Sequence, residues 1–118
     1  MSRFPIRSLT LSLCLFAGAY AHADCAYPKP PAEVNPKSAT EAEMIDAMKA
    51  FKQYNTDVDA YVTCLDKETE EKVKGADGAG AIVQIKSMQS KKKSSATDER
   101  QAAIDSFNKA VREFKAKG

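Results

Sequence analysis

Apolar side chains recur at spacings of three and four residues between Thr40 and Val73, with mostly polar residues between them. This spacing predicts one long amphipathic helix. Its apolar positions are Met44, Met48, Phe51, Tyr54, Val58, Tyr61, Val62 and Leu65. On a helical wheel these side chains cover an arc of about 140°. At about 1.5 Å per residue the helix extends roughly 50 Å, so it needs a partner of similar length.

The helix carries its own start and stop signals. Thr40 and Glu43 form an S/T-x-x-E capping box, in which each side chain accepts a hydrogen bond from the other residue's backbone N–H. Three glycines between Gly75 and Gly80 then predict the end of the helix and a reversal of the chain.

Helical spacing resumes after the glycines. The apolar or small side chains of this second face are Ile82, Ile85, Ala96, Ala103, Phe107, Val111 and Phe114, with Gln89 among them. The helical phase of the apolar positions is the same before and after the polar run 91–95, which favours a single helix. The alternative is a break near Ser94, with Ser95 or Thr97 as the N-cap of a new helix. Two long helices at about 40–73 and 81–116, joined by a turn at 74–80, predict an all-α antiparallel hairpin, similar to a coiled coil.

Residues 1–23 have the features of a secretory signal peptide. Arg3 and Arg7 precede a short apolar run, and an A-x-A cleavage site ends at Ala23. The apolar run is too short for a stable membrane span. We therefore expect cleavage after Ala23 and a periplasmic or secreted protein.

Cleavage changes the charge and the available chemistry. All 16 acidic residues follow residue 23, whereas two of the 18 basic residues, Arg3 and Arg7, precede it, so 16 acids face 16 bases. A neutral chain argues against a nucleic-acid-binding protein. His22, the one histidine of the sequence, leaves with the signal peptide, so no imidazole remains for catalysis or a metal site. We therefore expect that the protein is not an enzyme and that it binds no cofactor.

Two cysteines remain after cleavage, Cys25 and Cys64. An even pair in an exported chain predicts one disulfide, with free or metal-bound thiols as the alternatives. The segment 24–39 contains four prolines and should form an extended arm. At about 3.1 Å per residue, an arm running back from Thr40 is long enough to reach Cys64. The helical wheel predicts that it lies along Tyr54 and Tyr61.

One helix cannot cover a 140° apolar arc, and the arm covers only part of the rest. We therefore predict an interaction face for another envelope protein or a second copy, formed by Phe51, Tyr54, Val58, Tyr61 and Leu65. The alternative is a chaperone-like or envelope-associated helper that touches membrane or peptidoglycan through Lys91, Lys92 and Lys93. Such a run of lysines is more often a solvated helix face.

Four segments of the chain stand out together: the C-x-Y-P sequence that starts at Cys25, the segments 40–44 and 61–65, and the F-N-x-x-V-R-x-F-K sequence that starts at Phe107. In these segments the chain resembles a group of small exported proteobacterial proteins with a domain of unknown function. The resemblance covers most of the chain after the signal peptide. It implies export and a helical architecture, and no particular activity.

Overall fold

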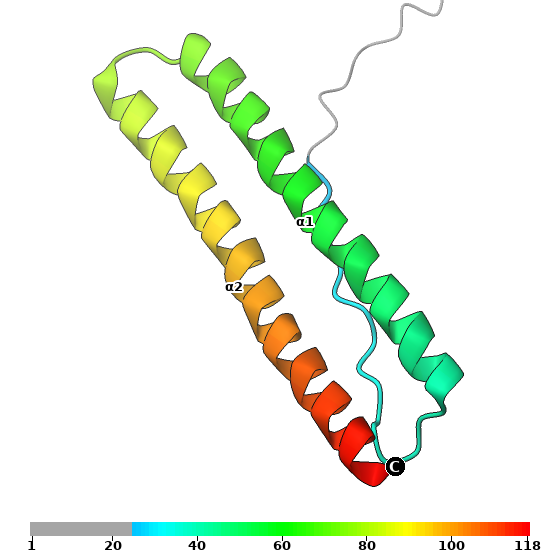
Figure 1. Ribbon diagram of the computed structural model, residues 1–118. Helices are drawn as coiled ribbons and strands as arrows, with labels where there is room; N and C mark the ends of the chain where they lie inside the picture. The colour runs from blue at the N-terminus through cyan, green and yellow to red at the C-terminus, as the bar shows by residue number, and fades with distance from the viewer. Residues whose placement is uncertain (1–24) are drawn as a thin grey trace, which may run out of the picture.

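The computed structural model describes residues 25–118, which form two long antiparallel helices with an extended segment alongside them (Figure 1). Helix α1 spans Glu41–Lys74 and helix α2 spans Ala79–Lys117. The predicted all-α hairpin with a disulfide-clipped arm is therefore confirmed. The predicted signal peptide lies outside the described residues. From residue 25 onward, neither helix is long and apolar enough to cross a membrane.

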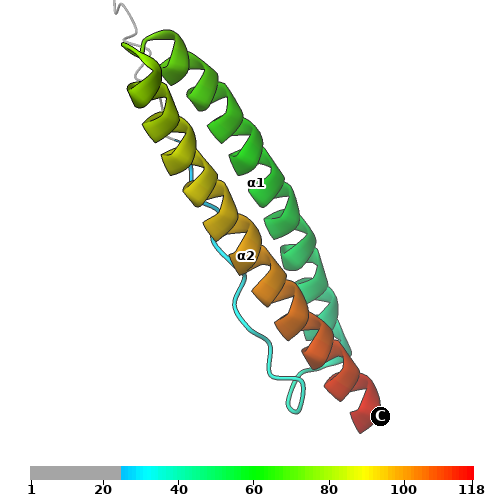
Figure 2. The same ribbon diagram turned by 90° about the vertical axis from the view of Figure 1, so that its left-hand side faces the viewer.

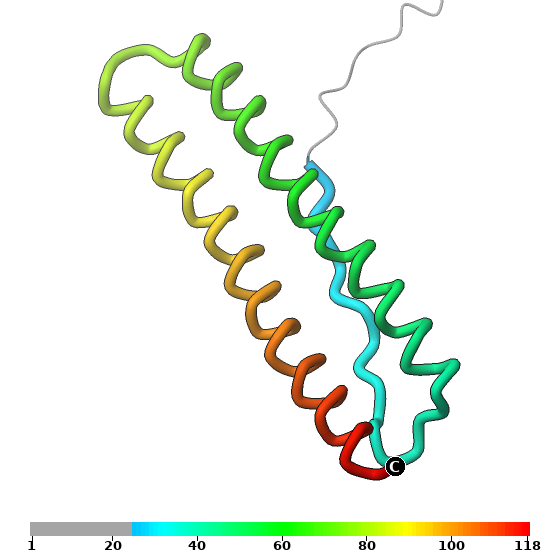
Figure 3. Tube along the Cα trace, in the orientation of Figure 1, coloured from blue at the N-terminus to red at the C-terminus, as the bar shows by residue number. Residues whose placement is uncertain are grey.

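The segment 25–39, called the arm below, contains no helix or strand, and its only regular feature is a turn at 36–38. Figure 3 shows it running from the middle of α1 to the open end of the hairpin. In the turned view it lies on one side of the plane of the two helices (Figure 2). Its prolines fix φ and remove N–H donors, which keeps the segment extended. The arm thus covers one groove of the hairpin along its open half and leaves the half near the turn uncovered.

The capping box predicted at the start of α1 is formed. The backbone N–H of Thr40 donates to the Glu43 carboxylate at 2.7 Å, and the backbone N–H of Glu43 donates to the Thr40 hydroxyl at 3.2 Å. Just before it, the Lys117 ammonium donates to the backbone carbonyl of Ala39 at 2.9 Å. The last turn of α2 is therefore fastened to the junction between the arm and α1.

The core lies between the two helices and the arm. It is built from four α1 side chains and one α2 side chain: Tyr54, Val58, Tyr61, Leu65 and Ala96. Val58 and Ala96 are fully buried. The small side chain of Ala96 leaves room for the larger α1 side chains, so the two helices can pack closely along this part of the hairpin.

The reversal between the helices is shorter than the sequence predicted. Helix α1 ends at Lys74 and α2 already begins at Ala79, two residues before the expected start. Gly78 has a φ of +88°, a conformation that L side chains rarely adopt. This one glycine turns the chain directly into α2, so the reversal needs fewer residues than the three glycines suggested.

Helix α2 runs unbroken through Ser94, the position where a break was the alternative. The hydroxyl of Thr97 donates back to the carbonyls of Lys93 and Ser94 at 3.0 and 3.1 Å, so it does not cap a new helix. Lys93 also forms an ion pair with Asp66 of α1. The helix tolerates this polar run because the Thr97 hydroxyl bonds to carbonyls of the preceding turn and Lys93 pairs with Asp66 of α1.

Candidate functional site

The disulfide Cys25–Cys64 joins the first described residue of the arm to the middle of α1. The two Cα atoms are 5.7 Å apart, and the closed loop spans 39 positions of sequence. Both residues are half-buried, and Cys25 packs against the core cluster. The disulfide therefore holds the arm where it covers the apolar stripe of α1.

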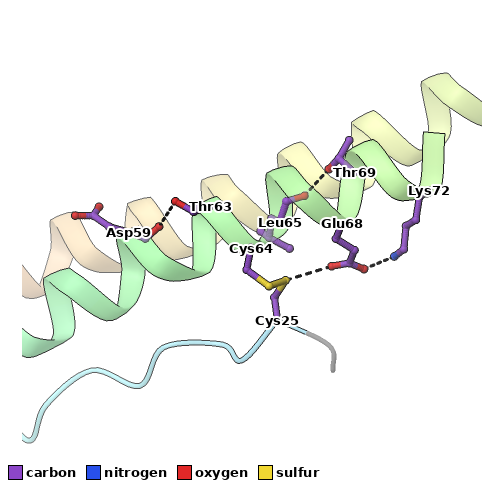
Figure 4. The surroundings of a disulfide bond; sticks show 8 residues. All are labelled: Cys25, Asp59, Thr63, Cys64, Leu65, Glu68, Thr69 and Lys72. Carbon is purple, nitrogen blue, oxygen red and sulfur yellow. Dashed lines mark hydrogen bonds and ion pairs between the residues drawn. A yellow bond between two sulfur atoms is a disulfide. The ribbon is translucent and has the colours of Figure 1, made fainter. Parts of the chain in front are cut away.

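A carboxylate stands beside this disulfide. A Glu68 oxygen lies 3.5 Å from the sulfur of Cys25, and Lys72 forms an ion pair with the same carboxylate (Figure 4). A disulfide sulfur carries no hydrogen, so the first contact is a close approach and not a hydrogen bond. The hydrogen bond from Lys72 lowers the pKa of Glu68, which outweighs the opposing effect of burial. Glu68 is therefore a negative charge next to the sulfur at neutral pH.

The first residues of the arm dock through an aromatic ring. The ring of Tyr27 meets the ring of Tyr61 edge-on, with centroids 5.2 Å apart and planes at 70°. The hydroxyl of Tyr27 donates a 2.7 Å hydrogen bond to the Glu99 carboxylate of α2. That hydrogen bond is the main cause that raises the pKa of Tyr27 to about 12. The next residue, Pro28, is buried. The arm thus runs along Tyr61 as predicted, and it also contacts α2.

The middle of the arm packs less closely. A cavity of about 260 Å³ lies between arm residues 30–36 and the two helices. Phe51 and Phe107 line it, and they stack in parallel with centroids 5.1 Å apart and an interplanar angle of 7°. Ala47, Ala103 and Ala110 line it too, and their small side chains leave the space open. The one polar contact of this stretch with α2 is a 3.4 Å hydrogen bond from Ser106 to Glu33.

The far end of the arm is a compact turn. The side-chain oxygen of Asn35 accepts from the backbone N–H of Lys37 at 3.0 Å, and its backbone carbonyl accepts from Ser38 and Ala39 at 3.3 and 2.9 Å. Ala39 is buried. The arm is therefore anchored at its first residues by the disulfide and Tyr27, at its far end by hydrogen bonds alone, and only loosely in between.

The structure corrects the predicted interaction face. Tyr54, Val58, Tyr61 and Leu65 keep only 2%, 0%, 6% and 1% of their surfaces exposed, and Phe51 is half-buried in the cavity wall. Helix α2 and the arm approach the stripe from neighbouring sides and together cover these five side chains, whereas Met48 of the same arc stays exposed. These side chains are the core of the folded chain, so no partner reaches them while the arm is in place.

Apolar side chains that do stay exposed lie elsewhere. They are Ile45 and Met48 near the start of α1, Val83 and Met88 near the start of α2, and Tyr27 on the arm. In the lysine run, Lys93 pairs with Asp66, Lys92 is half-buried and Lys91 is exposed. Among residues 25–118, no three His, Cys, Asp or Glu side chains gather in a way that could hold a metal ion.

The sequence placed Gln89 on the apolar face of the second helix but did not mark it as a buried polar group without a partner. This side chain is 2% exposed on the face of α2 that meets α1, and neither amide atom has a hydrogen-bond partner within the protein. Gln89 also lowers the pKa of Glu68, although its amide falls short of hydrogen-bond geometry.

No model of a known protein family matches this sequence, and no curated protein or solved structure is significantly similar to it.

Proposed function

We propose that this chain is a non-enzymatic, exported protein that acts by binding another protein of the cell envelope or a second copy of itself. The predicted signal peptide supports export. The disulfide supports it too, because disulfides persist in oxidising compartments. One observation carries the binding role: Ile45 and Met48 remain 42% and 41% exposed, three residues apart on one side of α1.

This pair has the composition of a small contact surface. Ile45 and Met48 are three residues apart, so they present one apolar patch on a rigid helix. Met is flexible and polarizable, and it adapts to irregular surfaces of a partner. Asp46 and Lys49 form an exposed ion pair of 3.9 Å beside the patch. An apolar centre with a charged edge is the usual arrangement of a protein–protein contact.

The test is site-specific photo-crosslinking in intact cell envelopes. A photoreactive amino acid replaces Met48 in one variant and Val83, which is 66% exposed near the turn, in the matched control. We expect a discrete adduct of defined mass at position 48 and little or none at position 83. Equal labelling at both positions would contradict this surface. Adducts with many proteins at both positions would favour the chaperone-like alternative.

A further inference from the structure

The arm occupies the hairpin groove in the way that a bound peptide occupies a receptor. It contributes no helix or strand, and its prolines make it extended before it docks. Its specific contacts are the Tyr27 ring on Tyr61, the Tyr27 hydrogen bond to Glu99 and the disulfide to Cys64. All of these are made by the first residues of the arm. The groove therefore recognises one short segment of sequence, and that segment is present in every copy of the chain.

The segment between this docking point and α1 can move with the loss of only a few hydrogen bonds. Residues 30–36 border the cavity, and their one hydrogen bond to the helices, from Ser106 to Glu33, is long. At the junction, opening the turn costs three hydrogen bonds to Asn35, two to its backbone carbonyl and one to its side-chain oxygen, together with those from Lys117 to the carbonyls of Lys37 and Ala39. The junction is thus a hinge that opens at the expense of a few exchangeable hydrogen bonds.

We infer that two copies of this protein exchange arms, so that the arm of each copy docks in the groove of the other and Cys25 of one bonds to Cys64 of its partner. The contacts that Cys25 and Tyr27 make with the groove are the same in the monomer and in the exchanged dimer, which makes such exchange a low-cost route to a symmetric dimer. This inference goes beyond the contact surface proposed at Ile45 and Met48, which takes no part in the exchange, and it names a second copy as a partner.

Exchange changes the pairing of sulfur atoms and not their oxidation state. A small thiolate first attacks the disulfide of one chain, forms a mixed disulfide with one cysteine and releases the other as a thiolate. That thiolate attacks the disulfide of the second chain, which forms the first interchain disulfide and releases a cysteine thiolate of the second chain. This thiolate attacks the mixed disulfide, which forms the second interchain disulfide and releases the small thiolate again. Starting from reduced chains, each new disulfide passes two electrons and two protons to a disulfide oxidant such as glutathione disulfide, which becomes two thiols.

Protein concentration decides between the two forms. A short flexible connection gives its own arm an effective concentration on the order of millimolar. Below that range the arm returns to its own groove, and near it the arm of a second copy competes. Once oxidised, the interchain disulfide holds the dimer after dilution. The monomer and the exchanged dimer should therefore both be isolable.

The first experiment uses the mature wild-type chain. Equal amounts of ¹⁵N-labelled and unlabelled protein are reduced, mixed and reoxidised with glutathione disulfide at a series of concentrations up to about 1 mM. The digested protein is then analysed by mass spectrometry. We expect Cys25–Cys64 peptide pairs that join a labelled half to an unlabelled half, and their fraction should rise with concentration. Only single-isotope pairs at every concentration would overturn the inference.

The second experiment separates docking from random collision. Cys25→Ser and Cys64→Ser are mixed, so that the one available Cys25–Cys64 bond is between chains. Adding Tyr27→Ala to the Cys64→Ser chain should reduce the yield of that heterodimer at least fivefold. Lys29→Ala, an exposed arm residue, should leave it unchanged. Equal yields for the two arm variants would mean collision alone and would overturn the inference. Neither result alters the photo-crosslinking outcome at Met48, so exchange and the broader binding function fail separately.

Discussion

The phenol oxygen of Tyr27 lies 2.7 Å from a carboxylate oxygen of Glu99, 72 positions further along the chain. This hydrogen bond connects the arm to α2, whereas the disulfide connects it to α1. Two neighbouring residues of the arm, Cys25 and Tyr27, therefore fix its position against both helices. The arm acts as the third layer of a hairpin that would otherwise leave its apolar stripe open.

Replacing Glu99 should change the ionisation of Tyr27. The hydrogen bond to Glu99 is the main reason that the pKa of Tyr27 is raised to about 12 from its ordinary value of 10.0. In Glu99→Gln the negative charge is absent, so the pKa of Tyr27 should fall toward 10. Ultraviolet difference absorbance records the phenolates of all tyrosines together, so the Tyr27 titration is the difference between each protein and its Tyr27→Phe counterpart. Asp98→Asn, the exposed neighbouring acid, is the control and should leave the titration unchanged.

The same shift predicts how stability depends on alkaline pH. Folded Tyr27 keeps its proton to a higher pH than unfolded Tyr27, so between pH 10 and about 12 the folded state binds more protons. The stability that this contact contributes is complete below pH 10 and is lost as the pH rises through about 12. Burial raises the pKa of Tyr54 and Tyr61 in the same direction. The free energy of unfolding, measured with urea across this pH range, should fall steeply in the wild type and less steeply in Glu99→Gln. Parallel plots of the free energy of unfolding against pH for the two proteins would refute the contribution of the contact.

Neutralising Glu68 should make the disulfide easier to reduce. Its carboxylate lies 3.5 Å from the sulfur of Cys25 and repels an incoming thiolate. A unit charge about 4 Å away is worth about 1 kcal/mol in water, or about fivefold in rate. Lys72 offsets part of that charge, so reduction of Glu68→Gln by glutathione should be about two- to fivefold faster. Glu70→Gln, exposed on the same turn of α1, is the matched control. Identical rates for both variants would show that Glu68 does not shield the sulfur.

Much of this fold is readable from local sequence signals. The capping box at Thr40 is a contact between residues three apart, so the sequence contains all of it. The hairpin follows from two long apolar periodicities with one short connection. The Cys25–Cys64 pairing follows from the two cysteines that remain after the expected cleavage and from the length of an extended arm beside a helix. Each of these features depends on spacing along the chain and not on the details of packing.

The features that the sequence did not reveal depend on three elements meeting at once. Wheel geometry located Tyr54, Val58 and Tyr61 on one stripe but did not show that α2 and the arm divide that stripe between them. As a result, the stripe was read as an open face when it is the core. Gly78 was one of three equivalent glycines until the backbone showed that it alone has a positive φ. The pairing of Tyr27 with Glu99 joins residues 72 positions apart and has no local signature.

Removing the disulfide should destabilise the protein without unfolding the hairpin at neutral pH. In the loop-entropy account, a crosslink that closes a loop spanning 39 positions contributes about 4 kcal/mol. We therefore expect the Cys25→Ser/Cys64→Ser double variant to lose up to about 4 kcal/mol in urea unfolding while keeping its helical circular dichroism. Hydrogen exchange should show the largest loss of protection in the arm. A loss below about 1 kcal/mol would mean that the arm's other contacts already hold it in place.

Replacing Gln89 with leucine should stabilise the protein. Both amide atoms of Gln89 are buried without a hydrogen-bond partner. Burying such a group costs about 1–3 kcal/mol of folding free energy, because its hydrogen bonds to water are lost and not replaced. Leucine has a similar volume and no polar atom, so Gln89→Leu should raise the free energy of unfolding by about 1–2 kcal/mol. Gln84→Leu, at an exposed position of the same helix, is the control and should stay within about 0.5 kcal/mol of the wild type. A destabilised Gln89→Leu would instead show that the amide is satisfied in solution, by water or by the Glu68 carboxylate, and that this polar contact between the helices is part of what fixes their register.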